Sequence, residues 1–187
     1  MSGKFLILLE KYYSVSYKLK PMKVIILVLS LSFFSFTFAQ NHNGEKAEIN
    51  KVVQQFKESI IKKDSVTFYS LFHENPVVWI GLVKDKTQQK RLELNPANTK
   101  NFFRDTYEIF FRGILEEKDS TEEKFEDVQI INDEVIASVT FNYSFWFNNK
   151  MTNWGKEFWH LIKVDGKWKI TSVVYSYELT KYYPKPK

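Results

Sequence analysis

The sequence predicts an α+β fold, with helices in its first part and a meander of four antiparallel strands at its C-terminal end. Two β-rich runs flank Asp165-Gly166, the strongest short signal for a tight hairpin. An amphipathic stripe after the N-terminal region is typical of a helix that packs on a sheet. Helices that precede a set of antiparallel strands pack against one face of the sheet, which defines the α+β class.

The composition is that of a protein with a substantial hydrophobic core. Hydrophobic residues make up 44% of the 187 residues and aromatic residues 17%, which excludes a globally disordered chain. Of 27 basic and 22 acidic residues, five lysines and one acid fall in residues 1–39, so the rest carries a net charge of only +1. Charges of both signs are mixed there, which predicts no nucleic-acid partner. The lack of cysteine excludes disulfides, thiolate metal sites and cysteine nucleophiles.

The N-terminal region, residues 1–39, is predicted to be a signal peptide. Three lysines precede an apolar run over residues 24–39, and Thr37 and Ala39 are small residues at the expected positions of a cleavage site. A membrane anchor is the alternative, but a membrane span needs about 20 apolar residues. We therefore expect a secreted or periplasmic protein with no membrane contact after cleavage. Met22 is the expected start of translation, with a long n-region as the alternative.

Residues 40–187 are predicted to form a single domain that begins with two helices. The first spans about residues 46–63, and its apolar stripe consists of Ile49, Val52, Val53, Phe56, Ile60 and Ile61. Asp64 or Ser65 can cap a second, shorter helix that ends at about Phe72, before Asn75-Pro76.

A strand and a third helix are expected next. Residues 77–83 form a short β-branched run, typical of a strand. The polar residues 84–100 are interpreted as a loop, and the helix is expected over about residues 99–115, where Gly113 fits its end. Its apolar stripe consists of Phe102, Phe103, Tyr107, Phe110, Phe111 and Ile114.

Four strands are predicted over about residues 124–131, 134–147, 155–164 and 167–177, joined in part by tight turns at Asn132-Asp133 and Asp165-Gly166. A two-residue turn at Asp165-Gly166 pairs Val164 with Lys167, Leu161 with Ile170 and Trp159 with Ser172. Because side chains alternate between faces, one face is then expected to hold Trp159, Leu161, Trp168, Ile170, Ser172, Val174 and Ser176. Trp168 is therefore predicted to lie in the core, and His160 on the other face.

Three local patterns in this order resemble the nuclear transport factor 2-like (SnoaL-like) family over about residues 45–177. They are Asp64-Ser65 before the second helix, Trp79-Ile80-Gly81 on the first strand and the segment from Asp165 to Ile170 in the hairpin. The resemblance implies a cone-shaped, curved antiparallel sheet with helices packed on its concave side and a pocket between them. Enzymes of this family use Asp, His or Tyr side chains in that pocket as a general base or as oxyanion donors.

The sequence favours ligand binding over catalysis. The last-strand positions where the family's enzymes carry an ionisable group hold Ser172 and Val174, and the acids, including Glu122 and Glu123, show no paired arrangement and are interpreted as a solvated face. We expect a small apolar or aromatic ligand, no cofactor and no metal. The predicted ligand-binding residues are Trp79, Phe103, Tyr107, Trp159, Ser172, Val174 and Ser176.

Two other functions remain open. The first is an isomerase or dehydratase type of enzyme with His160 or Tyr107 as acid or base, although a cross-strand or interface role is the alternative for His160. His73 fits a helix C-terminus, and His42 has no expected role. The second is an interaction module that acts through the sheet, because apolar residues on both faces predict a homodimer formed through the sheet. A buried ionisable pair around a bound ligand would favour the enzyme over the non-catalytic binding domain.

Overall fold

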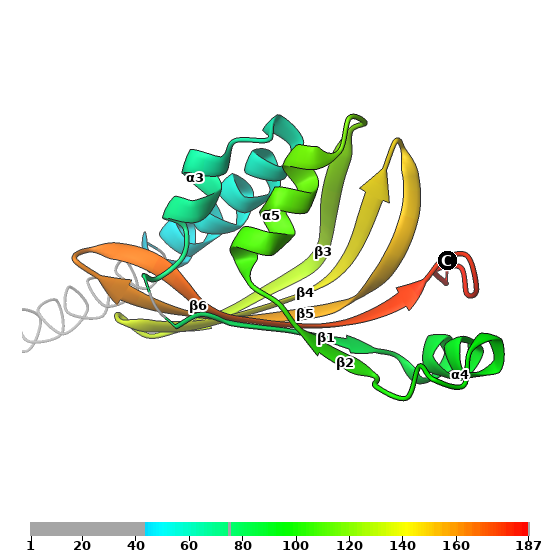
Figure 1. Ribbon diagram of the computed structural model, residues 1–187. Coiled ribbons are helices and arrows are strands. Elements are labelled where there is room, and N and C mark those ends of the chain that lie inside the picture. The colour runs from blue at the N-terminus through cyan, green and yellow to red at the C-terminus, as the bar shows by residue number, and fades with distance from the viewer. Residues whose placement is uncertain (1–43, 75, 187) are drawn as a thin grey trace, which may run out of the picture. The chain divides into compact units, whose positions relative to one another are not determined.

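The computed structural model describes residues 44–74 and 76–186, which all belong to one compact unit, His42–Lys187 (Figure 1). The predicted signal peptide and His42 lie outside the described residues. Within the described part of the chain, no helix is both long enough and apolar enough to cross a membrane.

The first two helices confirm the sequence analysis. Residues 44–62 are helical, and the apolar stripe is buried, with Ile49, Phe56 and Ile60 fully inaccessible. The exception is Ile61, which is 52% exposed and does not belong to the buried face. Helix α3 (Ser65–Ser70) follows, and the side chain of Asp64 accepts a hydrogen bond from the backbone N–H of Thr67 at 3.0 Å. Asp64 is thus the predicted helix cap.

The segment between the first strand and the third helix differs from the prediction. Strand β1 (Val78–Val83) leads into helix α4 (Asp85–Leu94), where a loop was expected. Strand β2 (Phe102–Arg104) then occupies the start of the helix predicted over residues 99–115. Helix α5 (Tyr107–Glu116) begins only after the cap Thr106, whose hydroxyl accepts from the backbone N–H of Ile109 at 3.2 Å.

The six strands form one sheet in the order β2-β1-β6-β5-β4-β3. Strands β3 (Thr121–Asn132), β4 (Ile136–Phe147), β5 (Lys150–Val164) and β6 (Lys167–Leu179) form the predicted antiparallel meander, and β1 adds to β6 in parallel. The sheet is strongly curved, with the first helix, α3 and α5 on its concave side and α4 beyond the ends of β1 and β2 (Figure 1). The predicted α+β class is confirmed.

The register of the β5–β6 hairpin corrects the predicted faces. Val164 pairs with Lys167 and Leu161 with Ile170, as predicted. A bulge at Thr171 then inserts one extra residue into β6, so His160 pairs with Ser172 and Trp159 with Val173. The predicted pairing of Trp159 with Ser172 is wrong. Because one residue of slip exchanges the faces, Val173, Tyr175 and Tyr177 share the Trp159 face, whereas Ser172, Val174 and Ser176 lie on the opposite face.

The core fills the space between the helices and the concave face of the sheet. Trp159 is fully buried, with its ring centroid 4.7 Å from that of Phe56 and 5.0 Å from that of Phe141. Trp168 is 5% exposed, which confirms its predicted place in the core. Rigid, interlocked rings of this kind bury much apolar area and fix the curvature of the sheet above them.

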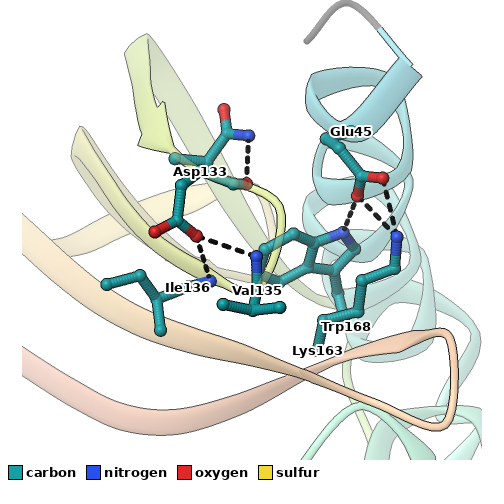
Figure 2. Close-up of polar contacts among 7 residues, drawn as sticks. Glu45, Asp133, Val135, Ile136, Lys163 and Trp168 are labelled. Carbon is teal, nitrogen blue, oxygen red and sulfur yellow. Dashed lines mark hydrogen bonds and ion pairs between the residues drawn. The ribbon is translucent and has the colours of Figure 1, made fainter. Parts of the chain in front are cut away.

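Polar contacts join the first helix to the β5–β6 hairpin and order the β3–β4 connection (Figure 2). Glu45, near the start of the first helix, accepts hydrogen bonds from the indole N–H of Trp168 at 2.9 Å and from Lys163 Nζ at 2.7 Å. At the β3–β4 connection, the carboxylate of Asp133 accepts the backbone N–H groups of Val135 and Ile136, both at 2.8 Å. A tight turn is present as predicted, but it lies over residues 133–135 instead of Asn132-Asp133, because Asn132 still pairs with Ala137 in the sheet.

Candidate functional site

A cavity of about 160 Å³ opens on the concave side of the sheet, between α5 and the strands. We call it the cone cavity. Its walls are predominantly aromatic and include two acids. The lining residues are Trp79, Phe110, Glu123, Tyr143, Phe145, Asn153, Glu157 and Tyr175.

Strand register brings these side chains together. Glu123 of β3 is opposite Phe145 of β4, which is in turn opposite Asn153 of β5. Glu157 of β5 is opposite Tyr175 of β6. Because alternate residues of a strand point to the same face, all five side chains project from the concave face into one volume.

Glu123 and Glu157 form a buried pair of acids. Their side chains are 5% and 3% exposed, and the two carboxyl groups share a hydrogen bond. Burial raises the pKa of Glu123 well above its usual value, and the charge of Glu157 raises it further. Burial also raises the pKa of Glu157, to about 7, although the indole N–H of Trp159 donates to its Oε1 at 2.7 Å and favours the charged form. The pair therefore holds at least one proton at neutral pH.

Two tyrosines face this pair. Tyr143 is 3% exposed, and its hydroxyl has no hydrogen-bond partner among the described residues. The hydroxyl of Tyr175 is hydrogen-bonded to the indole of Trp79. Burial raises the pKa of both tyrosines, so both phenols stay protonated at physiological pH. The Tyr143 hydroxyl is thus free to donate to, or accept from, a molecule in the cavity.

Gly155 allows the Tyr143 ring to take this position. A Cβ atom at residue 155 would lie 3.1 Å from the ring of Tyr143 and only 1.8 Å from the backbone oxygen of Ser176. No side chain can be accommodated there, because β6 approaches β5 too closely. The glycine therefore allows both β6 and the Tyr143 ring to approach β5 closely at this point.

The structure places some of the predicted ligand-binding residues at the cone cavity and others away from it. Trp79 lines the cone cavity, and Trp159 lies beneath it, where it orients Glu157. Phe103 instead lies over Gly81, and Tyr107 stacks on Phe72 at 4.1 Å between ring centroids. Neither residue is in the cavity lining. Burial raises the pKa of Tyr107 to about 12, which makes it a poor base.

The remaining predicted residues lie elsewhere. Ser172, Val174 and Ser176 are on the opposite face of the sheet because of the bulge at Thr171. His160 is exposed on that face and lines a separate hollow with Ile131 and Ile136. The structure thus places none of these four residues at the cone cavity.

The acid pair contradicts the expectation that the acids are unpaired and solvated. Glu122 fits that expectation, since its side chain is 40% exposed in an ion pair with Lys124, but the adjacent Glu123 points inward. Alternation along the strands is the sequence signal for these inward positions. Thr121 and Glu123 share a face of β3, and Glu157 precedes Trp159 by two residues on β5.

The described residues contain no group of three or more His, Asp or Glu side chains placed to hold a metal ion. The cone cavity presents two carboxyl groups, two phenols and an aromatic wall. Such a set can hold a proton, donate and accept hydrogen bonds, and bury a small apolar group.

Comparisons with known proteins identify the fold. No family model matches the sequence, and no curated protein matches it. Solved structures do match it. One is a candidate scytalone dehydratase from Novosphingobium aromaticivorans, with 16% identity, a TM-score of 0.56, and coverage of 75% of this chain and 89% of that chain.

Two further matches have the same fold. A nuclear transport factor 2-like protein of unknown function from Pseudomonas putida shows 7% identity and a TM-score of 0.54 over 72% of this chain and 87% of its own. A nuclear transport factor 2-like protein from Cytophaga hutchinsonii shows 12% identity and a TM-score of 0.51 over 70% of this chain and 96% of its own. The chain therefore has the nuclear transport factor 2-like fold, as its sequence pattern predicts.

Proposed function

We propose that this protein is an exported domain that binds a small, mostly apolar molecule in its cone cavity and anchors one polar group of that molecule. The observation that carries the proposal is the convergence of the Glu123–Glu157 pair and the unpartnered Tyr143 hydroxyl on a cavity with aromatic walls. Pockets for small molecules combine an apolar lining with a few placed polar groups in this way.

The size of the cavity limits the ligand. A volume of about 160 Å³ is close to that of an engineered cavity of about 150 Å³ that binds benzene. Drug-sized ligands occupy pockets of roughly 300 Å³ or more. The ligand is therefore the size of one six-membered ring with a short substituent.

The polar groups of the site fix the orientation of such a ligand. The acid pair offers several acceptor positions, and Tyr143 adds a hydroxyl that can donate or accept. A purely apolar ring would leave the Tyr143 hydroxyl unpaired, which is unfavourable for a buried group. A ring with one polar substituent satisfies it.

Export is the second part of the proposal. It is supported by the three lysines, the apolar run over residues 24–39 and the small residues Thr37 and Ala39.

Binding can be tested on the purified protein, residues 40–187, by ligand-observed NMR with phenol, benzyl alcohol and naphthalene. We expect the two single-ring alcohols to bind and the larger, apolar naphthalene not to bind. Tyr143→Phe should weaken the binding of both alcohols, whereas Tyr69→Phe, a change on an exposed tyrosine (37% exposed), should have no effect. If no single-ring compound binds, the proposal is wrong.

A second candidate function, proton-transfer catalysis, is favoured by the acid pair itself. A general base works best when its pKa is near the working pH, and burial brings the pKa of Glu157 to about 7. The pair could thus serve an isomerase or dehydratase type of reaction, in place of His160 or Tyr107. The fold shared with the candidate scytalone dehydratase permits such chemistry but does not assign it.

A Glu157→Gln variant distinguishes an enzyme from a protein that only binds its ligand. If the protein is an enzyme, the variant loses turnover of a compound that it still binds. The matched control is Glu122→Gln, because Glu122 lies on the exposed face of the same strand as Glu123. A wild-type protein that binds its ligand and leaves it chemically unchanged is a binding module.

A further inference from the structure

We propose that the cone cavity selects an organic cation, namely a protonated primary amine attached to a single ring-sized apolar group. This inference rests on the proposed function, since it names the chemical class of the ligand that the same cavity binds. Its basis is the charge of the cavity, the nature of its walls and the number of acceptors that meet in it.

The acid pair has no cationic partner among residues 44–74 and 76–186. The cavity lining contains two glutamates and no Lys, Arg or His. None of the ion pairs within residues 44–74 and 76–186 includes Glu123 or Glu157. Buried acids in proteins are normally paired with a cation or held neutral by a proton. The position of the missing cation is therefore open to a ligand.

Aromatic rings surround the place where that charge would lie. Trp79 and Phe110 have ring centroids 5.0 Å apart, Phe110 and Phe145 are 6.2 Å apart, and Tyr143 and Tyr175 are 6.1 Å apart. The faces of aromatic rings carry negative potential and attract ammonium groups, and Trp does so most strongly. A neutral polar ligand would gain nothing from this property of the walls.

The acceptors of the site match the donors of an ammonium group. A primary ammonium has three N–H donors in a compact head. The cavity presents two carboxyl groups, and the Tyr143 hydroxyl, buried and without a partner among the described residues, provides a third acceptor. The apolar part of the ligand would then lie among the rings of Phe110 and Phe145.

Binding of an ammonium exchanges one cation for another where Glu157 is protonated. Above a pH of about 7, Glu123 keeps its proton, and R–NH₃⁺ pairs with the ionised Glu157 carboxylate. Below a pH of about 7, both acids are protonated, so the proton of Glu157 leaves to solvent as R–NH₃⁺ enters, and the Glu157 carboxylate and the carbonyl oxygen of Glu123 accept N–H bonds. The site is then neutral before and after the exchange. The titratable groups that face Glu157 are Glu123 from β3, Tyr143 from β4 and Tyr175 from β6, whereas β1 and α5 contribute only Trp79 and Phe110.

This exchange gives the binding a definite pH dependence. Below a pH of about 7, where Glu157 is protonated, the ammonium must displace a proton, so its affinity falls with falling pH. An alkylamine remains protonated well above this range, as lysine does. The two phenols remain neutral throughout, because burial raises their pKa values.

The test compares benzylamine with benzyl alcohol, which has nearly the same shape and no charge, by isothermal titration calorimetry at pH 6 and pH 8. At pH 8 we expect benzylamine to bind at least tenfold more tightly than benzyl alcohol. Between pH 8 and pH 6 its affinity should fall about tenfold, as one displaced proton requires, whereas that of benzyl alcohol should not fall. Titrations in phosphate and Tris buffers at pH 7 should show proton release for benzylamine only.

Variants test whether the acid pair is the group that binds the ammonium. Glu157→Gln keeps the shape of the side chain and removes its charge, so benzylamine binding should weaken at least tenfold and by a larger factor than benzyl alcohol binding, which involves no charge on the ligand. Glu122→Gln, the exposed neighbour of Glu123, should change neither. Thermal unfolding checks that each variant is folded, and Tyr143→Phe supplies a second test, with a smaller loss of benzylamine affinity.

The outcomes separate this inference from the proposed function. If benzyl alcohol binds as tightly as benzylamine, or if benzylamine binding is independent of pH, the cation inference is wrong and the binding function stands. If neither compound binds, both are wrong. Loss of benzylamine binding in Glu122→Gln but not in Glu157→Gln would place the cation site elsewhere and also overturn the inference.

Discussion

Glu123 of β3 and Glu157 of β5 share a hydrogen bond across β4, the strand that lies between their own. Their partners on β4 are Phe145 and Phe141, with Tyr143 midway between them, and both acids line the same cavity as Tyr143. Two acids in contact and away from solvent cannot both be ionised without a cation. This relationship therefore links the stability of the fold to the pH and to the contents of the cavity.

The first prediction is that the protein loses stability as the pH rises from 5 to 8. In the unfolded chain Glu157 loses its proton near pH 4.5, whereas in the fold it holds the proton until about pH 7. The folded state thus binds more protons between these values, and the free energy of unfolding falls with rising pH. A pKa difference of this size corresponds to about 3 kcal/mol.

Urea unfolding of the wild type and of Glu157→Gln at pH 5, 6, 7 and 8 measures this effect. The variant has no proton to lose at residue 157, so its stability should depend less on pH and exceed that of the wild type at pH 8. Glu45, whose pKa is lowered by its hydrogen bond from Lys163, acts in the opposite sense, but its contribution is complete above pH 5. A wild type that gains stability up to pH 8 would contradict the prediction.

The second prediction contrasts two glycines. Gly155→Ala should destabilise the protein by about 3 kcal/mol or more, or prevent folding, because its Cβ would meet the backbone oxygen of Ser176 at 1.8 Å. Gly113→Ala should stabilise it by roughly 0.5–1 kcal/mol, because this residue lies within α5 and an added Cβ meets nothing within 4 Å. Both are measured by urea unfolding. Equal effects of the two substitutions would show that the close approach of β6 to Gly155 is wrong.

The sequence predicts those parts of the fold that depend on local signals. The hairpin at Asp165-Gly166 and the cap at Asp64 each depend on a few neighbouring residues, and both are confirmed. Helix α4 was missed because it is polar, with only Thr87 buried in it. Its backbone is anchored by Glu178, whose carboxylate accepts the Thr87 N–H at 2.7 Å from a strand far along the chain.

The candidate site depends on the register of distant strands, which is why it was only partly predictable. Alternation along β5 could have placed Glu157 beside Trp159 on the inner face. Its meeting with Glu123 requires the pairing of both β3 and β5 with β4. The bulge at Thr171 has no distinct sequence signal, and this single residue determines that Tyr175, rather than Val174, reaches the cavity.

The third prediction concerns Trp168, which joins the hairpin to the first helix (Figure 2). Trp168→Ala should cost about 3–5 kcal/mol, since the side chain is 5% exposed. Trp168→Phe should cost less, because it keeps most of the packing and loses only the 2.9 Å hydrogen bond to Glu45. A loss below about 1 kcal/mol for the alanine variant in urea unfolding would contradict the core position.

The fourth prediction is export with cleavage after Ala39. The mature protein should begin at Gln40, as expected from the small residues Thr37 and Ala39 behind the apolar run. Expression with residues 1–39 present, followed by N-terminal sequencing and intact mass measurement of the protein outside the cytoplasm, checks this. A mature chain that retains residues 24–39 would indicate a membrane anchor instead. A shift of the cut by a few residues would correct the site but not the export.

The last prediction is a homodimer formed through the outer face of the sheet, the face opposite the cone cavity. Strand pairing places Ile80, Val174 and Phe158 in one row across β1, β6 and β5. Phe158 is 46% exposed, and Val78 and Leu82, which share this face of β1, are also exposed. In the described part of the chain the three helices on the concave side leave this face uncovered (Figure 1).

A contiguous apolar row that is partly exposed is unfavourable in water, and a two-fold pairing of sheets would bury it. Light scattering of the mature protein at micromolar concentration should therefore give the mass of a dimer, and Phe158→Lys should give a monomer, because it places a charge at the most exposed position of the row. Lys156→Ala, two residues earlier on the same strand, serves as the control and should leave the dimer intact. A monomeric wild type, with Phe158→Lys equally soluble, would rule out this interface.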